Sequence, residues 1–387
     1  MAHIISIVAV WLVALSTIEC ISWTYPDPKD PRFKVKCIED LECFSTGPPW
    51  YDYPMRVATN VPEDCENITY NLFTPHNPEK PYVLQETKKS ILGSPFNASW
   101  PTQLYIHAYW ADQGSIDREL NKKDAALSNY HYNVIVPDFR DHVQIPYFRS
   151  VANIRVIAAR IAKFLKYLMA VTGIKPESIH LIGFSLGCHT CGYIGKRIPN
   201  LGRITGLSPA GRNFVGTAEE TRLVPTDALF VDVIITSGDG DYGLQQLDAG
   251  KCGHQNFFVN NARRQPGCSL LENTVPVINF MKDFPETYCD HIRSNTLWSE
   301  SLRRKDCTFR AVKCKSYEAF ERGECTEFNS PVAIMGIQAG HVPGVGPEDT
   351  LYLDTWAEPP YCNENNVIPR AMRKVTPKPP TKWMLNE

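Results

Sequence analysis

The segment 183–187, Gly-Phe-Ser-Leu-Gly, places Ser185 between two glycines in the pattern G-x-S-x-G. The apolar run 179–182 precedes this segment, and a stretch rich in small residues follows it. This order is typical of a nucleophile elbow, a tight turn between a strand and a helix that presents a serine hydroxyl to a substrate carbonyl. Glycines are needed because strand and helix crowd together there and leave no room for a Cβ atom. An ordinary glycine-rich turn is the alternative interpretation, but the flanking elements favour the elbow and make Ser185 the candidate nucleophile.

The elements around this turn follow an alternation of strands and helices. Helical spacing of apolar residues predicts one long helix over 151–171, ended by Gly173 and Pro176. Short apolar runs of the kind buried in a parallel sheet predict strands at 103–110, 132–137, 179–183, 204–207 and 230–236. We therefore expect an α/β fold with a mostly parallel central sheet and helices on both faces. Such sheets bind ligands at the carboxyl ends of their strands, where Ser185 would lie.

The composition is that of a large folded chain with little net charge. The 387 residues are 43% hydrophobic and 21% charged, with a formal net charge of -2. This length supports a large core, in one big α/β domain or two smaller ones. The absence of a basic balance argues against a nucleic-acid partner.

The amino-terminal end and the cysteines together predict secretion. The apolar segment 4–15 is too short to span a bilayer, and we interpret residues 1–20 as a signal peptide. One of the thirteen cysteines, Cys20, lies in this leader, and the even number that remains suits an oxidising compartment. Asn67 and Asn97 begin N-x-[ST] sequons, which predict glycans on surface loops unless the matches arise by chance.

Seven segments, taken in order, resemble one known family. They are 37–45 (CIEDLECFS), 106–109 (IHAY), 151–155 (VANIR), 181–187 (LIGFSLG), 230–234 (FVDVI), 265–268 (QPGC) and 289–294 (CDHIRS). Their order and spacing resemble the pancreatic lipase family of secreted α/β-hydrolases, which contains lipases and phospholipases A1. The resemblance runs from about Cys37 to Cys362 and implies the α/β-hydrolase fold with ester hydrolysis as its chemistry.

The resemblance implies roles for four residues of this chain. Ser185 matches the nucleophile, and His291 in the segment CDHIRS matches the base that takes its proton. The two N–H donors of the oxyanion hole match Leu186 and Tyr109. Ala108 replaces the usual glycine of the segment that carries Tyr109. A structural histidine is the alternative interpretation of His291 when it is considered without its motif.

The position of the triad acid departs from the family pattern. Segment 206–210 reads Gly-Leu-Ser-Pro-Ala, so Ser208 stands where the family has aspartate. A hydroxyl can accept a hydrogen bond but cannot offset the charge of an imidazolium, and the loss of the acid costs about 10⁴-fold in serine proteases. Asp239, in the polar segment after the strand 230–236, is our preferred substitute, with Asp241 beside it. An ordinary polar turn at these two aspartates is the equal alternative.

The calcium loop of the family is altered as well. Glu219 and Arg222 match residues that offer main-chain carbonyls, and Asp227 matches one carboxylate ligand, but Val224 replaces the other. Calcium prefers six to eight oxygen ligands, so we expect no bound metal, and we expect no other cofactor.

The resemblance also implies disulfides and a lid. A Cys268–Cys289 bond would close a lid over residues 269–288, whose mixed apolar and charged residues could cover the serine in water and turn toward lipid. The alternative is a disulfide-closed loop whose apolar residues fill the core. The pairs Cys37–Cys43 and Cys314–Cys325 also match, and two more bonds of open connectivity are expected among Cys65, Cys252, Cys307 and Cys362. Cys188 and Cys191 are expected to be buried thiols.

These observations predict a catalytic domain over 21–365 followed by a basic, proline-rich, disordered tail over 366–387. We expect no carboxyl-terminal β-sandwich and hence no colipase-type partner, while the oligomeric state stays open. Three functions remain. The leading one is a secreted lipase that acts on triacylglycerol at an oil-water or membrane interface, because a long lid favours neutral lipids. The others are a phospholipase A1 and a catalytically impaired lipid-binding or storage relative.

Overall fold

The computed structural model describes residues 30–57, 60–238, 251–268 and 289–367, and every structural statement below concerns those residues. An eleven-stranded sheet runs through the molecule in the order β12-β11-β13-β10-β9-β8-β7-β5-β6-β3-β4. Its strands are β3 (Thr69–Phe73), β4 (Tyr82–Leu84), β5 (Thr102–Ile106), β6 (Asn133–Asp138), β7 (Ile179–Phe184), β8 (Arg203–Leu207), β9 (Phe230–Ile235), β10 (Gln255–Val259), β11 (Phe309–Lys313), β12 (Val332–Met335) and β13 (Leu351–Leu353). The central pairs from β6 to β13 are parallel, and the outer pairs are antiparallel.

A separate hairpin of β1 (Val35–Cys37) and β2 (Cys43–Ser45) precedes the sheet. The α-helices are α2 (Lys88–Leu92), α3 (Gln113–Asn129), α4 (Tyr147–Thr172), α5 (Leu186–Gly195), α7 (Cys289–Arg303) and α8 (Tyr317–Glu321). Short 3-10 helices are η1 (Arg140–His142), η2 (Pro176–Ser178), η3 (Glu219–Thr221), η4 (Pro225–Asp227), η6 (Asn260–Ala262) and η8 (Glu364–Val367).

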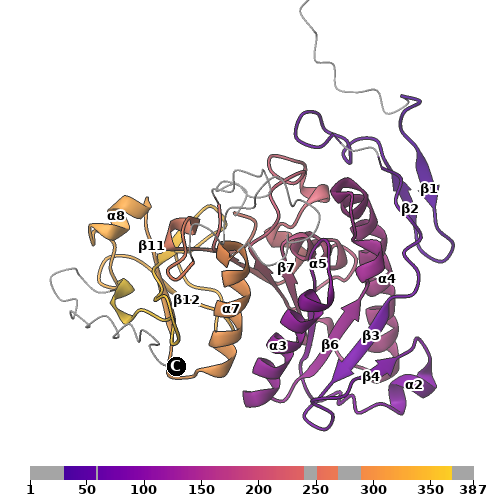
Figure 1. Cartoon of the computed structure of the whole chain (residues 1–387), viewed down its shortest axis with the longest axis horizontal. Coiled ribbons are helices and arrows are strands. Elements are labelled where there is room, and N and C mark those ends of the chain that lie inside the picture. The colour runs from indigo at the N-terminus through magenta and orange to yellow at the C-terminus, as the bar shows by residue number, and fades with distance from the viewer. Residues whose placement is uncertain (1–29, 58–59, 239–250, 269–288, 368–387) are drawn as a thin grey trace, which may run out of the picture.

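Helices cover both faces of the sheet (Figure 1). Because successive side chains of a strand point to opposite faces, Leu104 and Ile106 of β5 join the core cluster that contains the apolar residues of α4 and α5. Tyr105, between them, joins the cluster on the other side, which contains residues of α3 and α7. The two clusters hold the central strands between two helical layers, so the carboxyl ends of these strands form one rigid edge.

The sequence prediction of a mostly parallel sheet with helices on both faces is confirmed. The predicted helix 151–171 lies within α4, and Gly173 ends α4 in the left-handed conformation at φ 77°, as glycine permits. The strand predicted at 103–110 was too long, because β5 ends at Ile106. The chain then turns, Trp110 has φ 50°, and its N–H donates to Val143 O at 2.6 Å.

Four disulfides join cysteines of the described ranges. Cys37–Cys43, Cys268–Cys289 and Cys314–Cys325 confirm the three predicted pairs. The fourth joins Cys307 to Cys362. The expectation of a fifth bond was wrong: Cys65 and Cys252 are free thiols, each buried at 2% exposure. Cys188 and Cys191 are buried free thiols, as predicted.

Several predicted features lie outside the described residues. They are the leader 1–20, the candidate acids Asp239 and Asp241, the lid 269–288 and most of the tail. The beginning of the tail needs correction, because Asn366 and Val367 are buried and belong to η8, and Asn366 Oδ1 accepts from Asp354 N at 2.8 Å. None of the described helices combines the length and the apolar character that a membrane crossing requires.

Three buried histidines connect loops to the sheet and its helices. His189 on α5 accepts from Leu223 N through Nδ1 at 3.1 Å, and His107 after β5 accepts from Phe139 N through Nε2 at 3.3 Å. His180 on β7 lies 2.8 Å from Thr205 Oγ1 on β8. Burial lowers the pKa of His107 to about 4 and that of His189 to about 3, and it holds the pKa of His180 well below 6.5. The folded chain therefore keeps these rings neutral in mild acid.

We expect the free energy of unfolding to fall as the pH is lowered from 7 to 5. The unfolded histidines take up protons near pH 6.5 whereas the folded ones do not, so the unfolded state binds more protons and is favoured in acid. Each such histidine removes about 2 kcal/mol between pH 6.5 and 5. Urea titrations at pH 7 and pH 5 test this, with His189→Gln as the variant. Because burial also lowers the pKa of His291, four histidines contribute, and the variant should lose about one quarter of their pH dependence. An unchanged pH dependence would contradict the role assigned to His189.

Candidate active site

Ser185 lies at the turn between β7 and α5, with φ 53° and ψ -115°. This left-handed backbone is strained for a serine and is held by its neighbours, since Ser185 N donates to Leu207 O at 2.9 Å. A Cβ on Gly183 would lie 2.4 Å from Gly187 O, and a Cβ on Gly187 would lie 2.4 Å from Ile106 O. The turn therefore has the geometry expected of a nucleophile elbow, and both glycines are required by close backbone approach.

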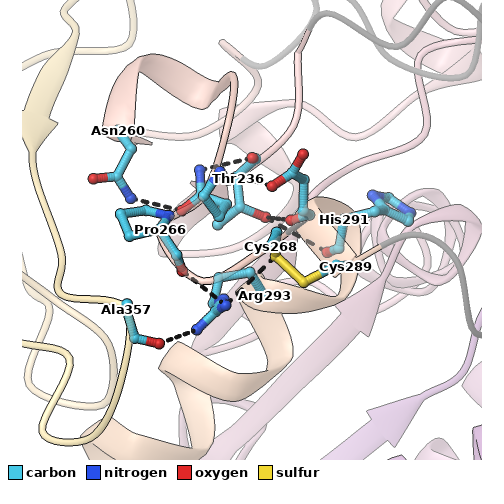
Figure 2. Close-up of a disulfide and its surroundings, with 10 residues drawn as sticks. Thr236, Asn260, Pro266, Cys268, Cys289, His291, Arg293 and Ala357 are labelled. Carbon is cyan, nitrogen blue, oxygen red and sulfur yellow. Dashed lines mark hydrogen bonds between the residues drawn. A yellow bond between two sulfur atoms is a disulfide. The ribbon is translucent and has the colours of Figure 1, made fainter. Parts of the chain in front are cut away.

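His291 lies in the first turn of α7, and its ring centroid is 4.7 Å from that of Phe184, the residue before Ser185. Figure 2 shows how the start of α7 is held. The Cys268–Cys289 disulfide ties it to the segment after β10, and Arg293 donates to Pro266 O at 2.9 Å and to Ala357 O at 3.3 Å. The structure thus brings the predicted base to the same strand edge as the predicted nucleophile.

The imidazole of His291 is kept neutral. Burial, together with the positive charge of Arg118, lowers the pKa of His291 to about 3. A neutral ring can accept a proton, which a general base at neutral pH must do. Within the described residues, Ser185 Oγ has no hydrogen-bond partner, so the proton transfer between Ser185 and His291 stays a prediction. Such contacts often tighten only when substrate is bound.

The Nδ1 atom of His291 lies within hydrogen-bond distance of Ser237 and not of Ser208, the serine at the predicted acid position. Ser237 Oγ is 3.3 Å from His291 Nδ1, whereas Ser208, at 1% exposure, bonds to Thr236. Thr236 Oγ1 donates to Asp290 O at 2.6 Å, so it accepts from the Ser208 hydroxyl at 3.0 Å. Ser208 therefore supports the backbone that carries His291, and among the described residues it forms no hydrogen bond with the imidazole ring.

Sequence analysis missed Ser237. The available signal was its place directly after the strand 230–236, where its side chain reaches the carboxyl edge of the sheet. The candidate acid Asp239 follows two residues later and lies outside the described residues. Its role stays a prediction.

The two predicted oxyanion donors lie close to this turn. Leu186 is the first residue of α5, and the first N–H groups of a helix have no partner within the helix. Tyr109 follows the segment 106–107 whose carbonyl oxygens approach Gly187, and its ring packs edge-on against Tyr147 at 5.0 Å. Within the described part of the chain, no acceptor is bonded to the N–H of Tyr109. Neither N–H group has a backbone acceptor among the described residues, and their role as oxyanion donors stays a prediction.

The residues matched to a calcium loop hold an ammonium instead. Lys196 Nζ lies 2.6 Å from Asp227 Oδ1 and 2.9 Å from Arg222 O. Asp227 is 4% exposed and also accepts from Val224 N at 2.9 Å. The main-chain and carboxylate oxygens that would bind calcium are therefore used by Lys196 and Val224, and the residues do not fit the ion.

We expect Lys196→Met to lower stability by about 3 kcal/mol, because it leaves the Asp227 carboxylate buried without its cation. Lys163→Met, a control at an exposed lysine whose nearest acid is 3.8 Å away, should change stability little. Thermal unfolding of the wild-type chain should be the same in millimolar calcium and in EDTA. A rise of the melting temperature on addition of calcium would show that an ion displaces Lys196.

Comparison with known proteins gives consistent matches. The family model described as Lipase matches residues 34–361. Pancreatic lipase-related protein 3 from Homo sapiens is 36% identical over 304 residues, covering 76% of this chain and 64% of that protein. Inactive pancreatic lipase-related protein 1 from Canis lupus familiaris is 33% identical over 331 residues, covering 82% and 67%. Pancreatic triacylglycerol lipase from Homo sapiens is 33% identical over 343 residues, covering 83% and 71%. The chain thus spans about two thirds of the length of these curated relatives.

Proposed function

Because the chain belongs to the lipase family and has an α/β-hydrolase fold, we propose that it hydrolyses acyl ester bonds of lipids, with triacylglycerol as the leading substrate. The observation that carries this proposal is the strained turn at Ser185. A serine held at φ 53° beside the first N–H groups of α5 is costly to the fold and useful for nucleophilic attack. The neutral ring of His291 beside Phe184 supplies the accompanying base.

The proposed reaction gives these residues the following roles. Ser185 Oγ attacks the ester carbonyl while His291 Nε2 takes the hydroxyl proton. The carbonyl oxygen becomes an oxyanion and accepts hydrogen bonds from the N–H groups of Leu186 and Tyr109. The carbon–oxygen bond to the alcohol breaks, and the alcohol leaves with the proton from His291. Water repeats the sequence on the acyl-serine and releases the fatty acid.

The Nδ1 atom of His291 needs a hydrogen-bond partner in each of these steps. When Nδ1 carries the proton it donates to Ser237 Oγ, and this leaves Nε2 as the basic nitrogen. A hydroxyl fixes the tautomer but does not neutralise the imidazolium, so Ser237 acts as a positioning residue. We propose Asp239 as the carboxylate that offsets the positive charge of the His291 imidazolium. Without such a carboxylate, catalysis would be weaker than in a complete triad.

Two alternatives are kept. A phospholipase A1 would use the same catalytic residues. The twenty residues between Cys268 and Cys289 are predicted to form a long lid, and this favours neutral lipids over phospholipids as the substrate. A lipid-binding or storage relative with impaired catalysis is favoured by Ser208 at the acid position, and one similar protein is named inactive. An extracellular location is part of the proposal, because four disulfides form readily only in an oxidising compartment.

A fluorophosphonate probe tests the enzyme against the binder. We expect the wild-type chain to be labelled covalently in the presence of lipid micelles, because the probe reacts only with an activated serine. Ser185→Ala should abolish labelling, and His291→Ala should reduce it at least 10²-fold. Ser178→Ala, at a surface serine of η2 that lies outside the site, is the matched control. Folded wild-type protein that takes up no label would support the binder.

Hydrolysis rates distinguish the partners of His291. Ser237→Ala should lower kcat about five- to tenfold with KM unchanged, because one neutral hydrogen bond of about 1 kcal/mol is lost. Ser237→Thr keeps the hydroxyl and should restore the rate. Asp239→Asn should lower kcat by about 10² or more, whereas Asp241→Asn should not. An unchanged rate for Asp239→Asn would remove Asp239 from the site, and a strong gain in Ser208→Asp would identify a weakened triad.

A further inference from the structure

A cavity of about 440 Å³ lies between α3 and α7, outside the residues proposed to hydrolyse the ester. These two helices run side by side on one face of the sheet (Figure 1). The loop 357–361 supplies the third wall through Pro359 and Tyr361. The volume lies in the range of about 300–1,000 Å³ that is usual for small-molecule sites.

The third wall is firmly attached to α7. Arg293 donates to Ala357 O at 3.3 Å, and its guanidinium lies 5.1 Å from the ring centroid of Tyr361. Figure 2 shows Arg293 between Ala357 and Pro266. The Cys307–Cys362 disulfide fixes the end of the same loop. The cavity is therefore formed before any ligand binds, which lowers the entropic cost of binding.

An unpaired carboxyl group lines this cavity. Glu300 of α7 is 7% exposed, and its Oε1 atom is buried without a hydrogen-bond partner. No described residue forms a hydrogen bond or an ion pair with this carboxyl. Burial raises the pKa of Glu300. Buried polar groups normally have partners, so the carboxyl is suited to a donor that enters from the cavity.

Two guanidinium groups line the cavity without an acidic partner among the described residues. Arg118 of α3 donates to Ser115 Oγ at 2.7 Å, and Arg303 of α7 donates to Asn121 Oδ1 at 2.9 Å. Arg304, next along α7, differs because it pairs with Asp306 at 2.8 Å. Asp117 of α3 also lines the cavity, and its carboxylate accepts from Gln113 Nε2 at 2.9 Å. The cavity thus combines two guanidinium groups from different helices, neither in an ion pair with a described acid, with one carboxyl that has no hydrogen-bond partner.

We infer that this cavity binds a small zwitterion that carries a phosphate and a primary ammonium. The phosphate accepts hydrogen bonds from Arg118 and Arg303, because its several oxygens can meet guanidinium groups that come from two directions. The ammonium donates to Glu300 and supplies the missing partner. A quaternary ammonium has no N–H to donate and is disfavoured. Such a zwitterion exists free in solution and as the headgroup of a phospholipid.

Isothermal titration of the full chain with sn-glycero-3-phosphoethanolamine tests the inference without any measurement of hydrolysis, so it stands or falls separately from the proposed function. Binding should weaken at least tenfold for sn-glycero-3-phosphate, which lacks the ammonium, and for sn-glycero-3-phosphocholine, which lacks its N–H groups. Wild-type protein that does not bind the first compound, or that binds the first and third compounds equally, would overturn the inference.

Three variants locate the site. Glu300→Gln should weaken binding of the ethanolamine compound at least tenfold and leave that of sn-glycero-3-phosphate unchanged. Arg118→Gln should weaken both compounds, and Arg310→Gln, on β11 outside the cavity and paired with Glu327 at 2.7 Å, should weaken neither. Unchanged affinity in Arg118→Gln would overturn the inference. The ligand series on the wild-type chain decides the matter even where Glu300→Gln does not fold.

Flotation with vesicles separates the two sources of the ligand. Capture by phosphatidylethanolamine vesicles, lost in Arg118→Gln and kept in Arg310→Gln, would assign the cavity to a lipid headgroup. Binding of the soluble compound with no such capture would assign it to a free phosphoethanolamine ester. Both results support the cavity as a zwitterion site.

Discussion

The close approach of three backbone segments at the end of β7 is the constraint on which the site depends. β7, the start of α5 and the end of β5 meet so tightly that neither Gly183 nor Gly187 has room for a side chain. Ser185, between them, is forced to a left-handed backbone that it would not adopt alone. The strain persists because the parallel sheet fixes β7 between β5 and β8 on both sides. The packing of the core thus offsets the backbone strain at Ser185 and holds its hydroxyl in place.

Two charged groups of the family pattern have no counterpart among the described residues: the carboxylate of the triad acid and the cation of the calcium loop. Ser208 takes the first position, and the ammonium of Lys196 takes the second. At the end of β8, Ser208 stands where the family has a carboxylate. Its hydroxyl bonds to Thr236, and Thr236 donates to the backbone carbonyl of Asp290 in α7. At the carboxyl end of α5, the oxygens matched to a metal bind the ammonium of Lys196. In both cases a local hydrogen-bond network keeps the backbone arrangement while the charge changes. A fold can therefore retain its site geometry after the electrostatics of the reaction have been altered.

Local patterns predicted the elements, and contacts through space supplied the rest. α4 and the central strands were predictable because hydrophobic period and chain breakers such as Gly173 act over a few residues. Ser185 was predictable for the same reason, since the elbow is a local turn. Ser237 was not, because its relation to His291 joins residues 54 apart in sequence and depends on where α7 meets the sheet. The pairing of Cys307 with Cys362, which leaves Cys65 free, was likewise set by the fold and not by cysteine count.

Helix α7 links the proposed base to the cavity between α3 and α7. Its first turn carries His291, and the disulfide at Cys289 joins both ends of the segment 269–288 to that turn. Arg293 holds the segments on either side, and the same helix continues to Glu300 at the cavity. Because a helix transmits displacement along its axis as a rigid body, a ligand beside Glu300 and a substrate beside His291 would act on one element, and the contacts of Arg293 limit how far that element can move.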